Sequence, residues 1–430
     1  VAMRLTRRDG DQDLTRFDAV LPPGVTAKLA GVPWCPDAAI ARARGRDGKD
    51  ELARPSCPAA SAIGTVQGGA GVGSQLTYVP GKVYLAGPTG GAPISVVGIV
   101  PAVAGPFDVG TIVVRQALDL DPITGQAKVV SAASDDLPHI LAGIPLRVRD
   151  IQVSVDRPNF TLNPTSCKEM ATLAGIWGGG ADVFSPHDDF PVLRRARFQA
   201  AGCRGLGFKP RLAIRLYGGT RRGAHPALRA IVRPRPGQAN FSRAAVTLPH
   251  SAFLDQAHIR TICTRVQFAA GAGHGSACPP GARYGTARAW SPLLDGPVTG
   301  PVYLRSSDNN LPDLVAALTG PPSAAVQVEL SARIDSVRGG IRSTFAGIPD
   351  LPVSRFLLDM QGGKKGLIVN SRNLCVQPKR NRAKANLRGQ NGKFSKARPV
   401  VRAVKCGKKR KKAKRSSHRR ARVASASTAG

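Results

Sequence analysis

The chain has 430 residues and a formal net charge of +35, with 62 Lys and Arg residues against 27 Asp and Glu residues. A chain this long exceeds one ordinary domain core, so we expect two domains, and no apolar run reaches the roughly 18 residues that a membrane-spanning helix needs. Aromatic residues make up only 5%, which argues against the base-stacking surfaces of single-strand and RNA readers.

Apolar residues alternate with a period of two along much of the chain, which predicts strands rather than helices. In residues 110–130, one face of a predicted hairpin carries Ile112, Val114, Leu118 and Leu120, and "DPITGQ" supplies the turn. Gly and Pro interrupt the strands about every ten residues, as in sandwich-like domains. The predicted fold class is therefore all-β, with tandem Ig-like β-sandwich repeats.

The second half of the chain repeats this pattern. Over 324–345 we expect another hairpin with Val326, Val328 and Leu330 on one face. The best helix candidate is 250–267, where Ser251 would cap the first turn. We expect one small helix in each half, held by a disulfide.

The eight cysteines form two groups of four, each with a short, a long and a medium separation. Other landmarks recur in the same order, such as the Ala-Gly-Ile-Pro motifs at 142–145 and 346–349. We interpret this as an internal duplication. The predicted units are repeat 1 (1–206), a linker that includes the first strand of the next unit (207–225), repeat 2 (226–406) and a disordered basic tail (407–430).

Four cysteines in each repeat allow three pairings, which the sequence alone does not distinguish. We favour pairing between nearest neighbours, namely Cys35–Cys57, Cys167–Cys203, Cys263–Cys278 and Cys375–Cys406. Free buried thiols and zinc are the alternatives, but the sequence has no C-x₂-C pair. Disulfides predict an oxidising compartment outside the cell.

No residue is predicted to be catalytic, to ligate a metal or to bind a cofactor. In "SPHDDF", His187, Asp188 and Asp189 are adjacent, and successive side chains of an extended strand point to opposite faces, so we expect a polar surface loop. Asp135 and Asp136 are expected in a turn at a strand end. The sequence lacks G-x-S-x-G, and its glycine-rich runs lack the ending of a phosphate-binding loop.

The C-terminal block is too densely charged to form a core and should stay disordered. Such a block binds polyanions by counterion release, without reading a sequence. The predicted polyanion contacts are Lys408, Lys409, Arg410, Lys411, Lys412, Lys414, Arg415, Arg419, Arg420 and Arg422. For an exported chain the partners would be anionic cell-wall or surface polymers. A merely solvated tail and a dedicated nucleic-acid function are the alternatives.

Several segments, among them "LAGVPWCP", "VPGKVYLAGP", "NFTLNPTSC" and "GQNGKF", together with the basic C-terminus, resemble uncharacterised secreted repeat proteins of actinobacterial type that have Lys/Arg-rich C-terminal tails. The resemblance covers nearly the whole chain. It implies export and further copies of the repeat upstream, in agreement with a sequence that begins without an initiator Met or a signal peptide. It implies no particular activity.

These observations together predict a secreted or cell-surface protein of the cell envelope, structural and non-enzymatic, which attaches through its tail to envelope polyanions. It would need no cofactor and would not recognise a specific nucleic acid. One alternative is an adhesin module whose Arg-bearing face binds a glycan or another protein. A further alternative is a hydrolase of envelope polymers, which would need a pocket where titratable residues meet.

Overall fold

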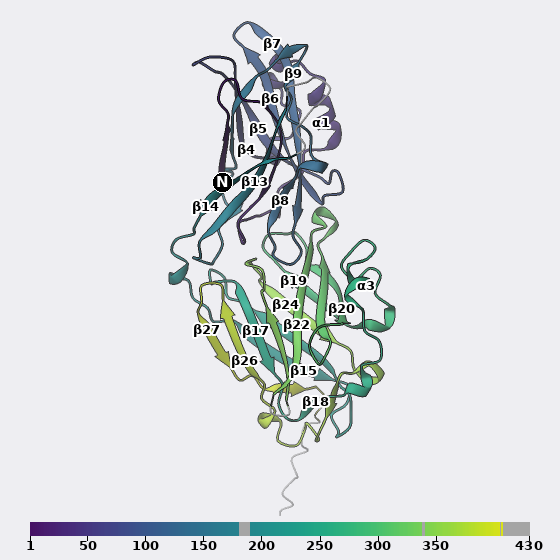
Figure 1. The fold of residues 1–430 in the computed structure, drawn as a ribbon. Coiled ribbons are helices and arrows are strands. Elements are labelled where there is room, and N and C mark those ends of the chain that lie inside the picture. The colour runs from purple at the N-terminus through teal and green to yellow at the C-terminus, as the bar shows by residue number, and fades with distance from the viewer. Residues whose placement is uncertain (180–189, 338–339, 405, 407–430) are drawn as a thin grey trace, which may run out of the picture.

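A computed structural model describes residues 1–179, 190–337, 340–404 and 406. The chain forms two large curled β-sheets that lie end to end, the first above the second in Figure 1. The predicted all-β class is thus confirmed. The described strands of the first sheet come from residues 2–198 and those of the second from residues 211–403. We refer to these two parts as the first half and the second half.

In the described part of the first half, one sheet contains ten strands, all paired with antiparallel neighbours. In spatial order they are β1 (Ala2–Thr6), β11 (Val148–Ser154), β4 (Ala62–Ala70), β5 (Thr77–Ala86), β6 (Ile94–Ala104), β7 (Phe107–Leu120), β8 (Ala127–Val130), β2 (Asp13–Val20), β13 (Met170–Gly179) and β14 (Val192–Phe198). The sheet curls until β11 and β2, which are not neighbours within it, come into contact. Each half is therefore one curled sheet rather than two separate sheets packed face to face.

The sheet of the second half curls in the same way. Its described strands are, in spatial order, β27 (Phe394–Ala397), β26 (Lys384–Gly389), β17 (Phe241–Thr247), β23 (Gly340–Ala346), β22 (Gln327–Val337), β21 (Asp313–Thr319), β20 (Val298–Arg305), β19 (Arg283–Trp290), β24 (Arg355–Met360), β16 (Ala227–Arg233), β15 (Arg211–Tyr217) and β28 (Val401–Ala403). Ile214 of β15 and Ile334 of β22, from distant strands, belong to one core cluster. Short ribbons pair β3 (Thr26–Ala27) with β12 (Thr161–Leu162), β9 (Ile140–Leu141) with β10 (Ile144–Pro145), and β18 (Ala252–Leu254) with β25 (Ile368–Asn370).

Both predicted hairpins are present. Strands β7 and β8 flank the turn at 121–126, and β22 and β23 form the second hairpin, of whose turn residues 338–339 lie outside the described residues. The side chains predicted to share a face all line the interior of their sheet: Ile112, Val114, Leu118 and Leu120 in the first half, and Val326, Val328 and Leu330 in the second.

Short helices cover the outer face of each sheet. They are α1 (Asp37–Arg44) and α2 (Gly48–Ala53) between Cys35 and Cys57, and α3 (Arg265–Ala269) between Cys263 and Cys278. Ile40 of α1 packs in one cluster with Val97 and Val113 of the sheet. The central strands are therefore apolar on both faces, and their sequences read as nearly continuous apolar runs. Among the described residues, no helix has the length and apolar character needed to cross a membrane.

The prediction of a helix over 250–267 is wrong for most of that segment. Residues 252–254 form β18, residues 256–258 form a 3₁₀ turn, and only residues 265–269 are α-helical. Pairing with β25 holds the segment extended, and Thr264, not Ser251, provides the helix cap through a capping box with Gln267. Tertiary strand pairing overrides the weak helical pattern.

The four disulfides join nearest-neighbour cysteines, as favoured from the sequence: Cys35–Cys57, Cys167–Cys203, Cys263–Cys278 and Cys375–Cys406. Their Cα–Cα distances of 5.2 to 5.7 Å are ordinary for disulfides. This set of bonds indicates an oxidising, non-cytoplasmic compartment.

Two segments that the proposed duplication aligns make the same local pairing. The amide of Cys35 donates to the Leu85 carbonyl, and that of Cys263 donates to the Leu304 carbonyl, each at 2.8 Å. The duplication of whole repeats stays a prediction, although these contacts agree with it.

The junction between the halves is held by backbone and side-chain hydrogen bonds. The Leu293 carbonyl accepts from the amides of Leu29 and Ala30, both at 2.9 Å, and the Glu329 amide donates to the Pro122 carbonyl at 2.7 Å. These bonds join loops at the facing ends of the two sheets, so they fix how the halves meet.

Asp350 is the buried anchor of this junction, at 5% exposure. Its carboxylate accepts hydrogen bonds from the Thr165 amide and hydroxyl at 2.8 and 2.6 Å, the Ser166 amide at 3.0 Å and the Asn240 side-chain amide at 2.8 Å. A Cβ on Gly24 would lie 2.9 Å from the Asp350 Cβ, and this close approach requires glycine. The carboxylate thus ties a loop of the first half to the second half.

We expect Asp350→Ala to lower the free energy of unfolding by about 3 kcal/mol, because it leaves the buried Ser166 amide and the part-buried donors of Thr165 and Asn240 without an acceptor. The measurement is denaturant unfolding with the disulfides intact. Asp295→Ala is the matched control, since Asp295 also bridges the junction, to the Gly31 amide at 3.1 Å, but is exposed. Equal effects of the two variants would contradict the role given to Asp350.

Acid should weaken the edge of the first sheet through Asp150. Hydrogen bonds from Arg4, Gln152 and Tyr78 lower the pKa of this buried carboxyl to about 2. A lowered folded-state pKa stabilises the fold above the unfolded value near 4, and this contribution is lost as the pH falls towards 2. We expect Asp150→Asn to cost about 1 to 2 kcal/mol at pH 7, since Arg4 is largely exposed.

Unfolding of Asp150→Asn and the parent chain across pH 2 to about 7 measures this contribution. The difference between them should shrink below about pH 4. Asp156→Asn, at an exposed position just beyond the same strand, serves as the control. A difference that does not depend on pH would show that the carboxylate charge is not responsible.

Candidate functional site

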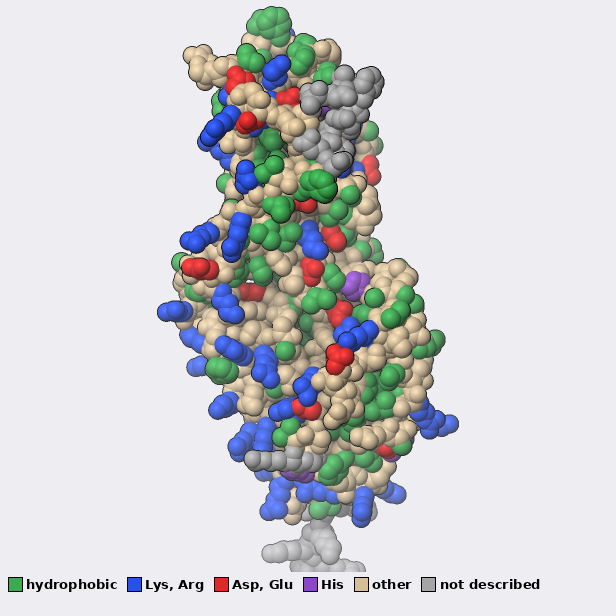
Figure 2. Space-filling view, viewed as in Figure 1, with side chains coloured by type: hydrophobic (Ala, Val, Ile, Leu, Met, Phe, Trp, Pro, Cys, Tyr) green, Lys and Arg blue, Asp and Glu red, His purple; other side chains and the backbone are tan. Residues whose placement is uncertain are grey.

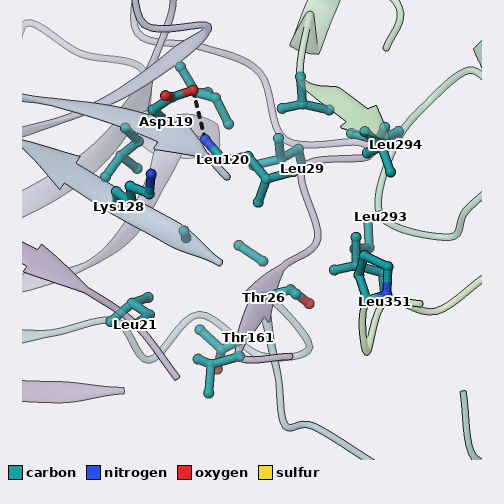
Figure 3. A pocket seen from close by; sticks show the side chains of 18 of the residues that line it. Leu21, Thr26, Leu29, Asp119, Leu120, Lys128, Thr161, Leu293, Leu294 and Leu351 are labelled. Carbon is teal, nitrogen blue, oxygen red and sulfur yellow. Dashed lines mark hydrogen bonds between the residues drawn. The ribbon is translucent and has the colours of Figure 1, made fainter. Parts of the chain in front are cut away.

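The interiors of the two curled sheets enclose a cavity of about 870 Å³. Residues of both halves line it, and Figure 3 shows Leu29 of the first half near Leu293 and Leu351 of the second. Protein interiors normally contain few voids larger than a water molecule. At about 24 cal/mol per Å³, a dry void of this size would cost on the order of 20 kcal/mol, more than the usual net stability of a domain. The cavity is therefore too large to be a packing defect.

The alternation of side chains along each strand decides which residues line the cavity. In β6, Val96, Gly98 and Val100 line the cavity, whereas Val97 points to the opposite face and packs beneath α1. In the second half, Val328 of β22 is one of many inward-facing apolar residues. One face of each sheet is thus committed to the cavity, and the other to the helices or the surface.

The cavity stays open because many inward-facing side chains are small. Gly68, Gly98, Ala70, Ala102 and Ala104 all line the first half. A Cβ on Gly98 would meet only Val66 at 3.8 Å and the Val114 carbonyl at 3.9 Å, so no neighbour requires glycine there. The 5% aromatic content leaves few large side chains to fill the two interiors.

Polar groups line the cavity mainly close to the junction. Asp119 of β7 and Lys128 of β8 are cross-strand partners and are the titratable residues among the described lining (Figure 3). Asp119 is exposed, and the side chain of Lys128 is 37% exposed. Thr26 and Thr161 lie in the same region. Both charged groups have partners, since Lys128 Nζ lies 3.3 Å from Asp121 and the Asp119 carboxylate accepts from the Leu120 amide at 2.8 Å.

Of the acidic, basic and His residues considered from the sequence alone as candidate functional groups, the structure describes only Asp135 and Asp136. The predicted polyanion contacts within 408–422, and His187, Asp188 and Asp189, fall outside the described residues. Asp135 pairs with Arg44, and Asp136 pairs with Arg16 at 2.7 Å. Both aspartates form ion pairs in the irregular segment between the 3₁₀ turn at 131–133 and β9, rather than in the predicted turn.

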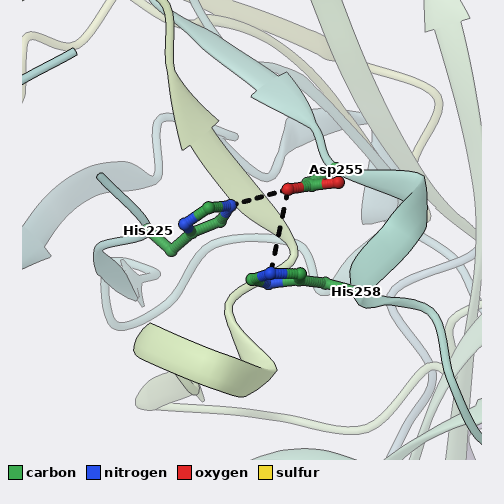
Figure 4. A group of neighbouring side chains, drawn as sticks. All are labelled: His225, Asp255 and His258. Atoms are coloured by element: carbon green, nitrogen blue, oxygen red, sulfur yellow. Dashed lines mark hydrogen bonds and ion pairs between the residues drawn. The ribbon is translucent and has the colours of Figure 1, made fainter. Parts of the chain in front are cut away.

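Sequence reasoning missed the cavity, and it also missed a group formed by His225, Asp255 and His258 (Figure 4). A hydrogen bond from the His225 ring is the main cause of a lowered Asp255 pKa. The i, i+3 spacing of Asp255 and His258 was the local signal available. His225 is distant in sequence, so only the fold brings it to the pair.

A comparison of the chain with protein-family models and with curated proteins finds no match. The geometry of the cavity and of the junction therefore carries the functional interpretation.

Proposed function

We propose that the protein binds a chain-like apolar ligand, of the class of lipid acyl chains, inside the cavity. The supporting observation is the single apolar cavity of about 870 Å³ that both halves line. Its volume is within the range of small-molecule sites, roughly 300 to 1,000 Å³. Moving an acyl chain from water into such a site gains about 0.8 kcal/mol for each buried CH₂ group.

The ligand class follows from the distribution of polarity. An apolar wall offers no directional contacts for a sugar or a peptide, whose polar groups would be buried without partners. Near the junction the cavity comes close to partly exposed charged groups, including the Lys128–Asp121 ion pair, and this is where a polar head could stay hydrated. An amphipathic lipid fits this arrangement better than a wholly apolar molecule does.

In the same proposal, the basic tail determines where the ligand-binding protein is held. The disulfides suit an oxidising compartment, and the basic block after Cys406 would attach the protein to envelope polyanions by counterion release. Figure 2 shows Lys and Arg side chains spread over the visible face and gathered towards the second half. This distribution supports general attraction to a polyanionic surface more than an adhesin groove for one glycan.

We expect Gly98→Phe to weaken binding of a fluorescent long-chain fatty acid about tenfold, because the new ring occupies the cavity without displacing a neighbour. Fluorescence titration of the full chain measures the affinity. Gly205→Phe is the matched control, since a Cβ there meets nothing within 4 Å and the position is exposed.

Two results would overturn the lipid proposal. One is an unmodified chain that binds no acyl probe and releases no lipid on solvent extraction. The other is a Gly98→Phe chain that unfolds like the parent chain and binds the probe equally well.

We expect deletion of 407–430 to release the protein from isolated cell-envelope fractions, and moderate salt to release the full chain, because counterion-release binding falls steeply with ionic strength. Quantitative blotting of bound and free fractions measures both effects. Acyl-probe affinity should be unchanged by the deletion. Retention of the truncated chain in low and high salt would rule out tail attachment.

A further inference from the structure

Two loops at the end of the second half away from the junction bring together two imidazoles and a carboxylate (Figure 4). His225 lies in the loop between β15 and β16, Asp255 follows β18, and His258 ends the next 3₁₀ turn. Nε2 of His225 is 2.7 Å from Oδ2 of Asp255, and Nε2 of His258 is 3.9 Å from the same oxygen. In the described part of the chain, these ligand atoms all lie within 4.8 Å of one another.

Neighbouring backbone groups orient both rings. Nδ1 of His258 lies 2.8 Å from the Gly366 carbonyl, and since a carbonyl can only accept, Nδ1 carries the proton and Nε2 keeps its lone pair. Metal-binding histidines typically use this kind of support. The His225 backbone is held by the Gly363 amide at 2.9 Å, and its ring stacks on that of His258 with centroids 4.1 Å apart.

We propose that His225, Asp255 and His258 bind one divalent cation of the zinc class. Ligand atoms about 2.0 to 2.1 Å from a tetrahedral Zn²⁺ are about 3.3 Å apart. The two distances to the Asp255 oxygen, 2.7 and 3.9 Å, lie on either side of this value. Each of these two distances would change by about 0.6 Å on coordination, and all three ligand atoms already lie within 4.8 Å of one another.

The ligand set selects the class of metal. Ca²⁺ and Mg²⁺ need several oxygen ligands, and this group offers one carboxylate beside two imidazoles. Zn²⁺ and neighbouring transition metals bind imidazole nitrogen well. The three side chains stay 18 to 25% exposed, so a water or substrate oxygen has access to a fourth position.

The site would brace the adjacent end of the cavity. The Asp255 amide donates to the Leu367 carbonyl at 2.9 Å, and Leu254, Leu367 and Ile368 line the cavity. A metal bound here would link the loops that flank this wall. The inference does not depend on lipid binding, because it uses only the distances among the three ligand side chains.

The test is titration of the full, disulfide-intact chain with Zn²⁺ against a chromogenic chelator, together with Co²⁺ absorption spectra. We expect one equivalent of metal to bind, and tetrahedral Co²⁺ to give visible d–d bands. His258→Ala and Asp255→Asn should each weaken Zn²⁺ binding at least about tenfold. His250→Ala is the control, because His250 is exposed and lies outside the group.

Thermal unfolding with and without metal provides the second readout. Zn²⁺ should raise the midpoint of the parent chain and of His250→Ala, because the folded state alone holds the three ligands together, and it should not raise that of His258→Ala. If the variants fold in chelator as the parent does, while the parent binds Zn²⁺ no more tightly than they do, the group is a His–Asp ion pair and the proposal is wrong.

Discussion

The buried carboxylate of Asp350 is the interaction on which the shared interior depends. It accepts hydrogen bonds from a loop of the first half and from the Asn240 side chain of the second, at a point where Gly24 lets the backbones approach closely. A charge buried this deeply is tolerated only with such a full set of donors. Because it fixes how the two sheets meet, it also makes one cavity out of two interiors.

The sheets that surround the cavity owe their rigidity to what lies outside them. A sheet that leaves its inner face unpacked loses the contacts that normally stabilise a core. Here the outer face compensates, since Ile40 of α1 and Phe268 of α3 pack on the strands beside the Cys35–Cys57 and Cys263–Cys278 disulfides. The helices and disulfides on the outer faces stabilise the sheets, so the cavity can stay open for a ligand.

The charged end of the proposed lipid site and the proposed metal site lie near different ends of the second half. The polar pair Asp119 and Lys128 lies at the junction, whereas His225, Asp255 and His258 lie near the opposite end of the second half. Cys375–Cys406 closes the described chain just before the basic block. Ligand binding, bracing of the cavity end and surface attachment can therefore be altered separately by mutation.

The sequence by itself determined the all-β class and both hairpins, because period-two alternation is a local pattern. It favoured nearest-neighbour disulfides, but the fold decided among the three pairings that each set of four cysteines allows. Only the tertiary structure decided that Val114 and Val328 face an open cavity, since an inward apolar residue reads the same whether or not another side chain fills the space before it. It also replaced the helix expected at 250–267 with β18, through pairing with β25. His225 meets Asp255 and His258 because β25, which pairs with β18, also hydrogen-bonds through Asn370 to the loop that carries His225.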